Sequence, residues 1–437
     1  MPSAPIISQE TYKEYLEIKG RCNLSGEIKV SGAKNSALVL MAASLLTKES
    51  IRLNNVPQLT DIEGMNSILL NLGAEIQNRE NELNITAEYI NHAELPYELV
   101  KGLRASFFCI GPLLARTGQV KIPLPGGCQI GARPVTEHIN GLKALGAYLS
   151  VEHAVVTASI PGNKSRLTGA DVLLDCPSVG ATETILMAAA LAQGTTTIEN
   201  AAQEPEVQDL ANLLNKMGAR ISGAGGPKIT IEGVQELYGC EYTVMPDRIE
   251  AGTFLIAGAI TRSSITVAPI IPQHINALLQ KLRDCGCSIE IDKQAITIRP
   301  QALLQGVDIT TQPFPGFPTD LQAPFMALMT TVKGTSIITE KIYENRMQHV
   351  SELQRMGASI RIQGNTAVVE GVPELSAAPV IGGDLRSSAA MVLASLNAKG
   401  TSRVEGLSHL DRGYSGLEKK LNKAGAHIVR KQQTSVH

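Results

Sequence analysis

The stretch PLPGGCQIGARP, residues 123–134, combines a thiol and a guanidinium on a backbone suited to neither a helix nor a ladder strand. Its three glycines and three prolines in twelve residues favour a loop. Glycine lets the backbone approach a ligand closely and turn its N–H groups toward an anion. We therefore consider a chemical role for Cys128 beside Arg133, with an inert small side chain in a turn as the alternative.

Charged side chains recur at the starts of predicted apolar helices, namely Lys34, Arg104, Arg248, Asp320 and Arg386. Helix N-termini carry unpaired N–H groups and partial positive charge, so several that converge on one cleft form an anion site. A cation at such a start opposes the helix dipole and adds little stability, which favours a functional role for Lys34, Arg104 and Arg386. For Asp320 a helix cap is the structural alternative.

One unit recurs six times along the chain. A helix that ends in glycine and is followed by a strand occurs in LLNLGAEI, LKALGAYL, LLNKMGARI, LRDCGCSI, LQRMGASI and LNKAGAHI. The glycines are 68–73 residues apart and are Gly73, Gly146, Gly218, Gly286, Gly357 and Gly425. After each glycine, period-2 alternation around a turn predicts a hairpin, so each unit is a helix that leads into two strands.

A second, nearly all-apolar segment belongs to each unit, as in ILMAAALAQGTTTIE and AMVLASLNAKGTSRVE. A helix that is apolar on every side must be enclosed by other elements. Six units of about 70 residues are too large for one core, and two groups of three match the usual domain size. The pattern therefore predicts an α/β protein of two similar domains.

The last unit reaches the C-terminus without a returning strand. The segment LEIKG, residues 16–20, resembles the returning strands ITIEG and AVVEG, so we predict that it completes the last unit. The C-terminal domain then comprises residues 1–33 and 246–437, and the N-terminal domain residues 34–245. The chain passes from one domain to the other near Lys34 and again near Asp247, and two such connections are compatible with a hinge between the domains.

The amino-acid composition argues against a nucleic-acid-binding or membrane-spanning protein. The chain has 437 residues, 43% hydrophobic residues, a net charge of −2, 3% aromatic residues and no Trp, which argues against nucleic-acid binding. Apolar runs end near ten residues, too short to span a bilayer, and the N-terminus is not typical of a signal peptide. Seven cysteines without CxxC pairs fit a reducing compartment and offer no zinc site. We expect a cytoplasmic monomer that acts on small molecules, with no nucleic-acid or membrane partner.

Ten strings, in order along nearly the whole chain, carry a family resemblance. They are VSGAKNSAL, LRASFFCIGPLLAR, LPGGCQIGARP, PSVGATE, QEPE, PDRIEAGTF, FPTDLQ, ENRMQHV, DLRSSAA and HLDRGY. With them the chain resembles the UDP-N-acetylglucosamine enolpyruvyl transferases of the enolpyruvyl transferase family. The resemblance implies two inside-out α/β barrels (an α/β prism), each of three βαβαββ units, with the active site in the cleft between them.

The resemblance also implies a reaction and a site. The enolpyruvyl group of phosphoenolpyruvate would pass to the 3′-hydroxyl of UDP-N-acetylglucosamine with release of phosphate, the first committed step of peptidoglycan synthesis, without cofactor or metal. The residues matching catalytic groups are Cys128 (proton donor, able to form a phosphoenolpyruvate adduct), Asp320 (base), Lys34 and Arg412. Those matching phosphoenolpyruvate contacts are Lys34, Asn35, Arg133, Arg386 and Arg412. Those matching sugar-nucleotide contacts are Arg104, Arg133, Pro134, Val135, Thr136, Glu137, Ser178, Val179, Gly180, Asp320 and Ile342.

Two departures and three alternatives accompany this interpretation. Some relatives have RPVDLH where this chain has RPVTEH, and some carry a lysine where Cys176 stands, so this chain does not match the lysine contact to the diphosphate. A shikimate-3-phosphate enolpyruvyl transferase would lack the GGCQIGARP loop. An RNA 3′-terminal cyclase would need a nucleotidyl-transfer histidine motif, which none of the eight histidines provides. A silent paralogue would be expected to lose the residues that this chain keeps.

Overall fold

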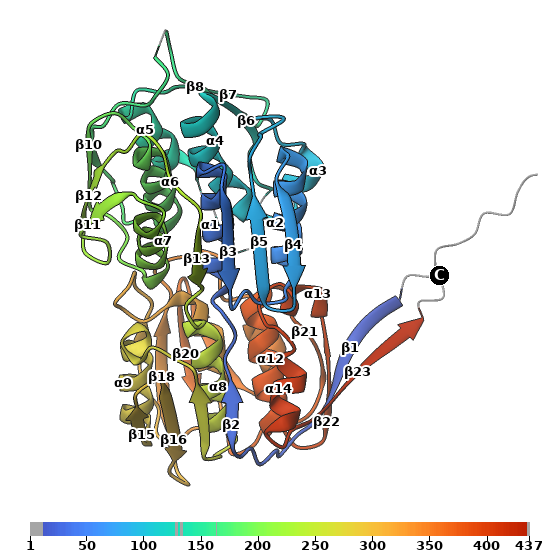
Figure 1. The fold of residues 1–437 in the computed structure, drawn as a ribbon. Coiled ribbons are helices and arrows are strands. Elements are labelled where there is room, and N and C mark those ends of the chain that lie inside the picture. The colour runs from blue at the N-terminus through green and yellow to red at the C-terminus, as the bar shows by residue number, and fades with distance from the viewer. Residues whose placement is uncertain (1–11, 127–129, 132–133, 163, 435–437) are drawn as a thin grey trace, which may run out of the picture.

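The computed structural model describes residues 12–126, 130–131, 134–162 and 164–434. Two stacked bodies are visible in Figure 1, with the blue strands β1 and β2 placed among the yellow and red elements of the second body. Each body has its own hydrophobic core. The first core is drawn from residues 33–245, and the second from residues 16–30 and 249–428.

The described strands form six sheets, three around each core. Around the first core the sheets are β13 (Cys240–Thr243), β3 (Ser50–Asn54), β5 (Glu82–Thr86) and β4 (Glu75–Arg79); β6 (Gln119–Pro123), β8 (Val155–Ser159) and β7 (Tyr148–Glu152); and β9 (Asp171–Leu173), β10 (Thr195–Glu199), β12 (Lys228–Glu232) and β11 (Arg220–Ser222).

Around the second core the sheets are β2 (Glu27–Lys29), β14 (Ile265–Ala268), β16 (Ala295–Pro300) and β15 (Cys287–Asp292); β17 (Ile309–Thr310), β18 (Thr335–Thr339), β20 (Thr366–Glu370) and β19 (Ser359–Gln363); and β21 (Pro379–Ile381), β22 (Thr401–Glu405), β1 (Tyr12–Lys19) and β23 (His427–Thr434).

Two kinds of helix accompany the sheets. The inner, apolar ones are α1 (Lys34–Ala43) with η1 (Ser44–Leu46), η2 (Arg104–Cys109) with α4 (Ile110–Thr117), α6 (Val179–Ala190), α8 (Arg248–Ile260), η4 (Thr319–Leu321) with α10 (Gln322–Met329), and α12 (Leu385–Asn397). The others are α2 (Thr60–Leu72), α3 (Tyr97–Val100), α5 (Thr136–Ala144), α7 (Pro205–Lys216), η3 (Pro272–Ile275), α9 (Asn276–Cys285), α11 (Val350–Arg355), α13 (Leu407–Leu410) and α14 (Leu417–Lys423).

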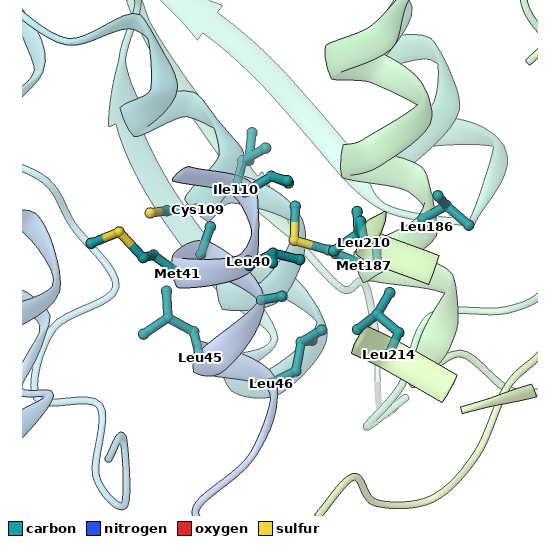
Figure 2. Close-up of a cluster of buried hydrophobic side chains, with 14 of the residues drawn as sticks. Leu40, Met41, Leu45, Leu46, Cys109, Ile110, Leu186, Met187, Leu210 and Leu214 are labelled. Atoms are coloured by element: carbon teal, nitrogen blue, oxygen red, sulfur yellow. The ribbon is translucent and has the colours of Figure 1, made fainter. Parts of the chain in front are cut away.

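The inner helices are enclosed, as their all-round apolar sequences predict. Figure 2 shows Leu40 and Met41 of α1 among side chains from the other inner helices of the first body and from α7, including Ile110 and Met187. These four side chains are fully buried. The fold is therefore the predicted two-domain α/β prism, with sheets outside and apolar helices inside.

The predicted unit is repeated with one reduction. Its first two strands are parallel, and its third and fourth form a hairpin whose fourth strand pairs with the second, as in β9, β10, β11 and β12. In the second sheet the first strand is reduced to a single bridge between Glu94 and Lys121. The next N–H toward this strand would come from Pro123, two residues after Lys121, and proline cannot donate to a ladder, so pairing stops there.

The N-terminal strand completes the last unit, as predicted. β1 lies between β22 and β23 and pairs antiparallel with both, with Leu16 opposite Val404 and Arg430. The six repeat glycines are confirmed as well, since each has a positive φ, between 87° and 109°, the conformation that favours glycine after a helix.

Three boundaries differ from the sequence prediction. Pro123, placed in the loop, is the last residue of β6 and lies opposite Val155. The second and fifth inner helices begin as 3₁₀ turns, at Arg104 and Thr319, before α4 and α10. Pro112 and Pro324 explain this, because proline fits an α-helix only in its first turn. Among the described helices, none is both long and apolar enough to span a membrane.

Candidate functional site

Asp320 lies between two buried arginines at the start of an inner helix of the second core. Its Oδ1 accepts a hydrogen bond from Arg346 at 2.8 Å, and its Oδ2 accepts one from Arg386 at 2.7 Å. The arginine side chains are 4–5% exposed, while that of Asp320 is 26% exposed. A carboxylate with one open side and two cationic partners can face a ligand while its charge stays neutralised.

The same contacts determine the charge state of Asp320. Burial raises the pKa of its carboxyl, but the charges of Arg386 and Arg346 outweigh burial and hold the pKa well below its ordinary value. Asp320 is therefore ionised at neutral pH, and in this arrangement it is a weak base. It does not cap its own helix with its side chain, so the structural alternative raised above does not account for it.

A second charged group joins the two bodies. Asp61 of α2 accepts hydrogen bonds from Lys34 Nζ at 3.1 Å and from Arg412 Nε at 2.8 Å. Lys34 and Asp61 are buried, whereas the Arg412 side chain is 40% exposed. Burial lowers the pKa of Lys34 and Asp61 opposes this, while the charge of Arg386 lowers it further. The Asp61 and Asp320 groups therefore lie within electrostatic reach of each other.

A cavity of about 1050 Å³ opens beside the Asp61 group. It is lined from the first body by Asp61 and Leu103, among others, and from the second by Leu407 and Arg412. Asp320 is not part of its lining. Two further residues were matched to substrate contacts. Asn35 is exposed at the start of α1, and Arg104 is half-buried at the start of η2.

The residues matched to sugar-nucleotide contacts include two adjacent helix starts. Pro134, Val135, Thr136 and Glu137 lead into α5. Ser178, Val179 and Gly180 open α6, where Ser178 Oγ accepts from the Ala181 N–H.

Contacts between these helices place the two starts together. A side chain at Gly180 would collide with His138 of α5, whose Nδ1 hydrogen-bonds Thr184 of α6 at 2.9 Å. The Glu137 carboxylate also accepts the Asp175 N–H at 3.1 Å. Two N-termini that meet in this way present several backbone N–H groups to an anion.

Cys128 and Arg133, the central predictions in the loop, lie outside the described residues. The neighbouring Ile130 is described, and its carbonyl accepts the Asn345 N–H at 3.0 Å. Ile342, matched to a sugar-nucleotide contact, lies in the same turn and donates its N–H to Glu340 at 2.8 Å. Residues of the first body therefore contact the turn that carries Arg346.

The sequence reasoning missed Asp61 and Arg346 as site residues. Arg346 lies inside the matched string ENRMQHV, which is a usable signal, but it does not lie at the start of a predicted inner helix. Asp61 lies in the first turn of α2. Acidic residues are common there because they interact favourably with the helix dipole, so the sequence alone does not mark Asp61 as a site residue. Arg248 was noted, but its partner was not: Glu206 binds it through three contacts of 3.0–3.3 Å.

His349, three residues after Arg346, provides a pH-dependent prediction. It is 3% exposed, and burial lowers its pKa to about 4. Because the unfolded chain binds this proton near pH 6.5 and the folded chain does not, stability is lost as pH falls from 6.5 toward 4. Between pH 6.5 and 5.0 the loss attributable to His349 should be about 1.5 kcal/mol, measured by urea unfolding as the difference between wild type and His349→Gln. His92→Gln, at an exposed position, is the control, and equal slopes for wild type and His349→Gln would contradict the prediction.

Among the described residues, no group of three or more His, Cys, Asp or Glu side chains could hold a metal ion.

Solved structures share this architecture. The fold matches the enolpyruvyl transferase NikO from Streptomyces tendae with a TM-score of 0.86 at 24% identity, over 97% of this chain and 100% of that one. It matches an EPSP synthase from Acinetobacter baumannii with a TM-score of 0.75 at 17% identity, over 96% and 100%. The fold is therefore that of the enolpyruvyl transferases.

Sequence comparisons give the family. A model described as EPSP synthase (3-phosphoshikimate 1-carboxyvinyltransferase) matches residues 18–421. The chain is 70% identical over 432 residues to a UDP-N-acetylglucosamine 1-carboxyvinyltransferase of Prochlorococcus marinus (strain MIT 9313), covering 99% of each. It is 66% identical to one of Synechococcus sp. (strain CC9605), covering 97% of this chain and 98% of the relative. The chain belongs to the EPSP synthase family of enolpyruvyl transferases.

Proposed function

We propose that this chain transfers the enolpyruvyl group of phosphoenolpyruvate to the 3′-hydroxyl of UDP-N-acetylglucosamine and releases phosphate, the step that commits the sugar nucleotide to peptidoglycan. The observation that carries the proposal is the open-sided Asp320 carboxylate held by Arg346 and Arg386 within electrostatic reach of Lys34. The names of the 66–70% identical relatives support the choice of acceptor.

The proposed reaction is an addition followed by an elimination. A proton adds to C3 of phosphoenolpyruvate, the sugar hydroxyl adds to C2 and loses its proton, and the tetrahedral intermediate then expels phosphate and a C3 proton. The resemblance assigns the donor to Cys128 and the base to Asp320. Lys34, Arg386 and Arg412 suit the phosphate and carboxylate, because cationic groups bind oxyanions through charge-assisted hydrogen bonds.

Binding of an anionic substrate would raise the basicity of Asp320. In the described arrangement both its oxygens are bound by arginines, so it accepts a proton poorly. When an anionic substrate occupies Arg386, part of that positive charge is neutralised, and the pKa of Asp320 rises toward a range useful for a base. The carboxylate can then also stabilise the oxocarbenium character that protonation of C3 creates at C2.

The adjacent starts of α5 and α6 suit the diphosphate. Their N–H groups favour negative charge, whereas Cys176, exposed beside Glu137 and Asp175, supplies no cation where some relatives carry lysine. Affinity for the sugar nucleotide would then rely more on backbone groups than on side-chain charge.

Phosphate release from phosphoenolpyruvate tests the proposal. We expect release with UDP-N-acetylglucosamine and none with shikimate 3-phosphate, the acceptor named by the matching family model. Release with shikimate 3-phosphate alone would refute the assignment. Cys128→Ala should lower the rate by about 10²–10⁴-fold, the usual contribution of a positioned acid. Fosfomycin, an epoxide phosphonate, should add its mass to Cys128, and an unmodified thiol would contradict the proposed role.

We further propose the division into residues 34–245 and residues 1–33 with 246–437, and a cytoplasmic monomer. The two separate cores support the division. Analytical ultracentrifugation with and without both substrates tests the oligomeric state.

A further inference from the structure

Helix α1, which begins with Lys34, has no N-terminal cap of its own. Its N-cap residue, Ala33, has no side chain that could accept a hydrogen bond. The Lys34 N–H instead donates to Oδ2 of Asp247 at 3.2 Å. The cap of α1 is therefore supplied from a residue more than two hundred positions away, at the second crossing between the bodies.

Asp247 already caps its own helix. Its Oδ1 accepts the N–H groups of Ile249 at 2.8 Å and Glu250 at 3.0 Å at the start of α8. The residue is 7% exposed, so water competes little for these bonds. One carboxylate thus uses its two oxygens on two helices, α8 with the second core and α1 with the first.

The backbone holds Asp247 in place for this double contact. Its N–H donates to the Ser31 carbonyl at 2.9 Å, and the Ala33 N–H donates to the Met245 carbonyl at 2.7 Å. Between these bonds, Gly32 and Pro246 form a bridge, and a side chain at Gly32 would collide with the Asn55 carbonyl. The two crossings are therefore locked together directly before Lys34.

Electrostatics favour a carboxylate at this point. Lys34 places positive charge at the positive end of α1, which is unfavourable, and a carboxylate on its N–H offsets that cost. The field of Asp247 also reaches the Asp320 group: burial lowers the pKa of Arg386, but Asp320 and, more weakly, Asp247 raise it above its ordinary value.

We propose that Asp247 is a positioning residue for Lys34, in which one carboxylate caps α8 and α1 together and so fixes the Lys34 ammonium against Asp61 and the bound phosphoenolpyruvate. The kinetic part of this inference rests on the proposed function. The structural part, that the start of α1 depends on the second oxygen of Asp247, does not.

Two variants separate the two caps. Asp247→Asn keeps one oxygen for α8, but its amide group would face the Lys34 N–H, donor against donor. Asp247→Ser can also cap α8, yet its side chain is too short to reach Lys34. Both should leave α8 capped and α1 uncapped. Asp308→Asn is the matched control, since Asp308 accepts a single backbone N–H, that of Ile337, at an exposed place.

Hydrogen exchange is measured first, without substrates. Peptides spanning residues 33–38 should exchange about tenfold faster in both variants, the effect of losing one charge-assisted bond, while those at the start of α8 keep their wild-type rates. Unchanged exchange at α1, or loosening of α8 instead, would overturn the proposal whatever reaction the protein catalyses.

Kinetics are measured second. In both variants kcat/KM for phosphoenolpyruvate should fall about tenfold or more, as expected when a reacting group is displaced, while the KM for UDP-N-acetylglucosamine stays within about twofold. Equal losses for both substrates, or wild-type kinetics, would overturn the positioning role. A wild-type protein inactive with these substrates would instead refute the proposed function and leave the exchange result standing.

Discussion

Asp320→Asn should lower the rate of phosphate release by about 10²–10⁴-fold, the usual contribution of a positioned base. Asparagine cannot take up the proton of the attacking hydroxyl. It also leaves Arg346 and Arg386, both at most 5% exposed at the side chain, without their counter-charge, so phosphoenolpyruvate should bind without being turned over. Steady-state phosphate release and calorimetric binding of each substrate measure the two effects separately.

The control for this variant is Glu290→Gln. Glu290 also pairs with an arginine, Arg299, but on the exposed face of the sheet that contains β15 and β16. It should keep the wild-type rate, because an exposed pair of this kind contributes little. If folded Asp320→Asn released phosphate within about threefold of wild type, Asp320 could not be the base.

Glu206→Ala should produce the largest loss of stability, about 3–5 kcal/mol, the usual cost of breaking a buried ion pair by removing one partner. The side chains of Glu206 and Arg248 are 5% and 10% exposed and pair at 3.0 Å. The variant leaves a buried guanidinium next to Glu204, whose Oε1 is already engaged by the Phe314 N–H at 3.2 Å. The free energy of unfolding in urea measures the loss.

The matched variant is the double substitution Glu206→Leu with Arg248→Met. Removing both charges leaves neither Glu206 nor Arg248 as a buried ion without its partner, and apolar replacements of similar volume are often neutral. We expect the double variant to recover most of the stability lost by Glu206→Ala. A single variant within about 1 kcal/mol of wild type would mean that the pair is solvated or that Glu204 replaces Glu206.

The sequence predicted the features that have a local signal. Gly73 and its five equivalents indicate helix ends, because only glycine readily adopts the positive φ found after these helices. The strand at residues 16–20 was recognisable because it resembles its equivalents in the other units. Lys34 and Arg386 stood out because a cation at a helix start lacks a structural reason.

The pairings of these charges had no such signal. Nothing near Asp61 in the sequence indicates Lys34 and Arg412, and nothing near Asp247 indicates α1. Lys34 meets Asp61 only when the first body folds, and the other partners meet only after the two bodies are assembled. The reduced first strand of the second unit depends on Pro123, which has no N–H for the next ladder position. The local sequence does not show which strand lies beside Pro123. Tertiary partners of buried charges are therefore the part that the three-dimensional structure adds.

The placement of β1 between β22 and β23 has a consequence for the order of folding. During synthesis, β1 emerges first but has no partner strand until Thr401–Glu405 and His427–Thr434 have been made. The first core uses only residues 33–245 and can therefore form while the second is still incomplete. Contacts between positions so far apart are slow to form, so the second core should be the last part to become resistant to proteolysis as the chain emerges from the ribosome.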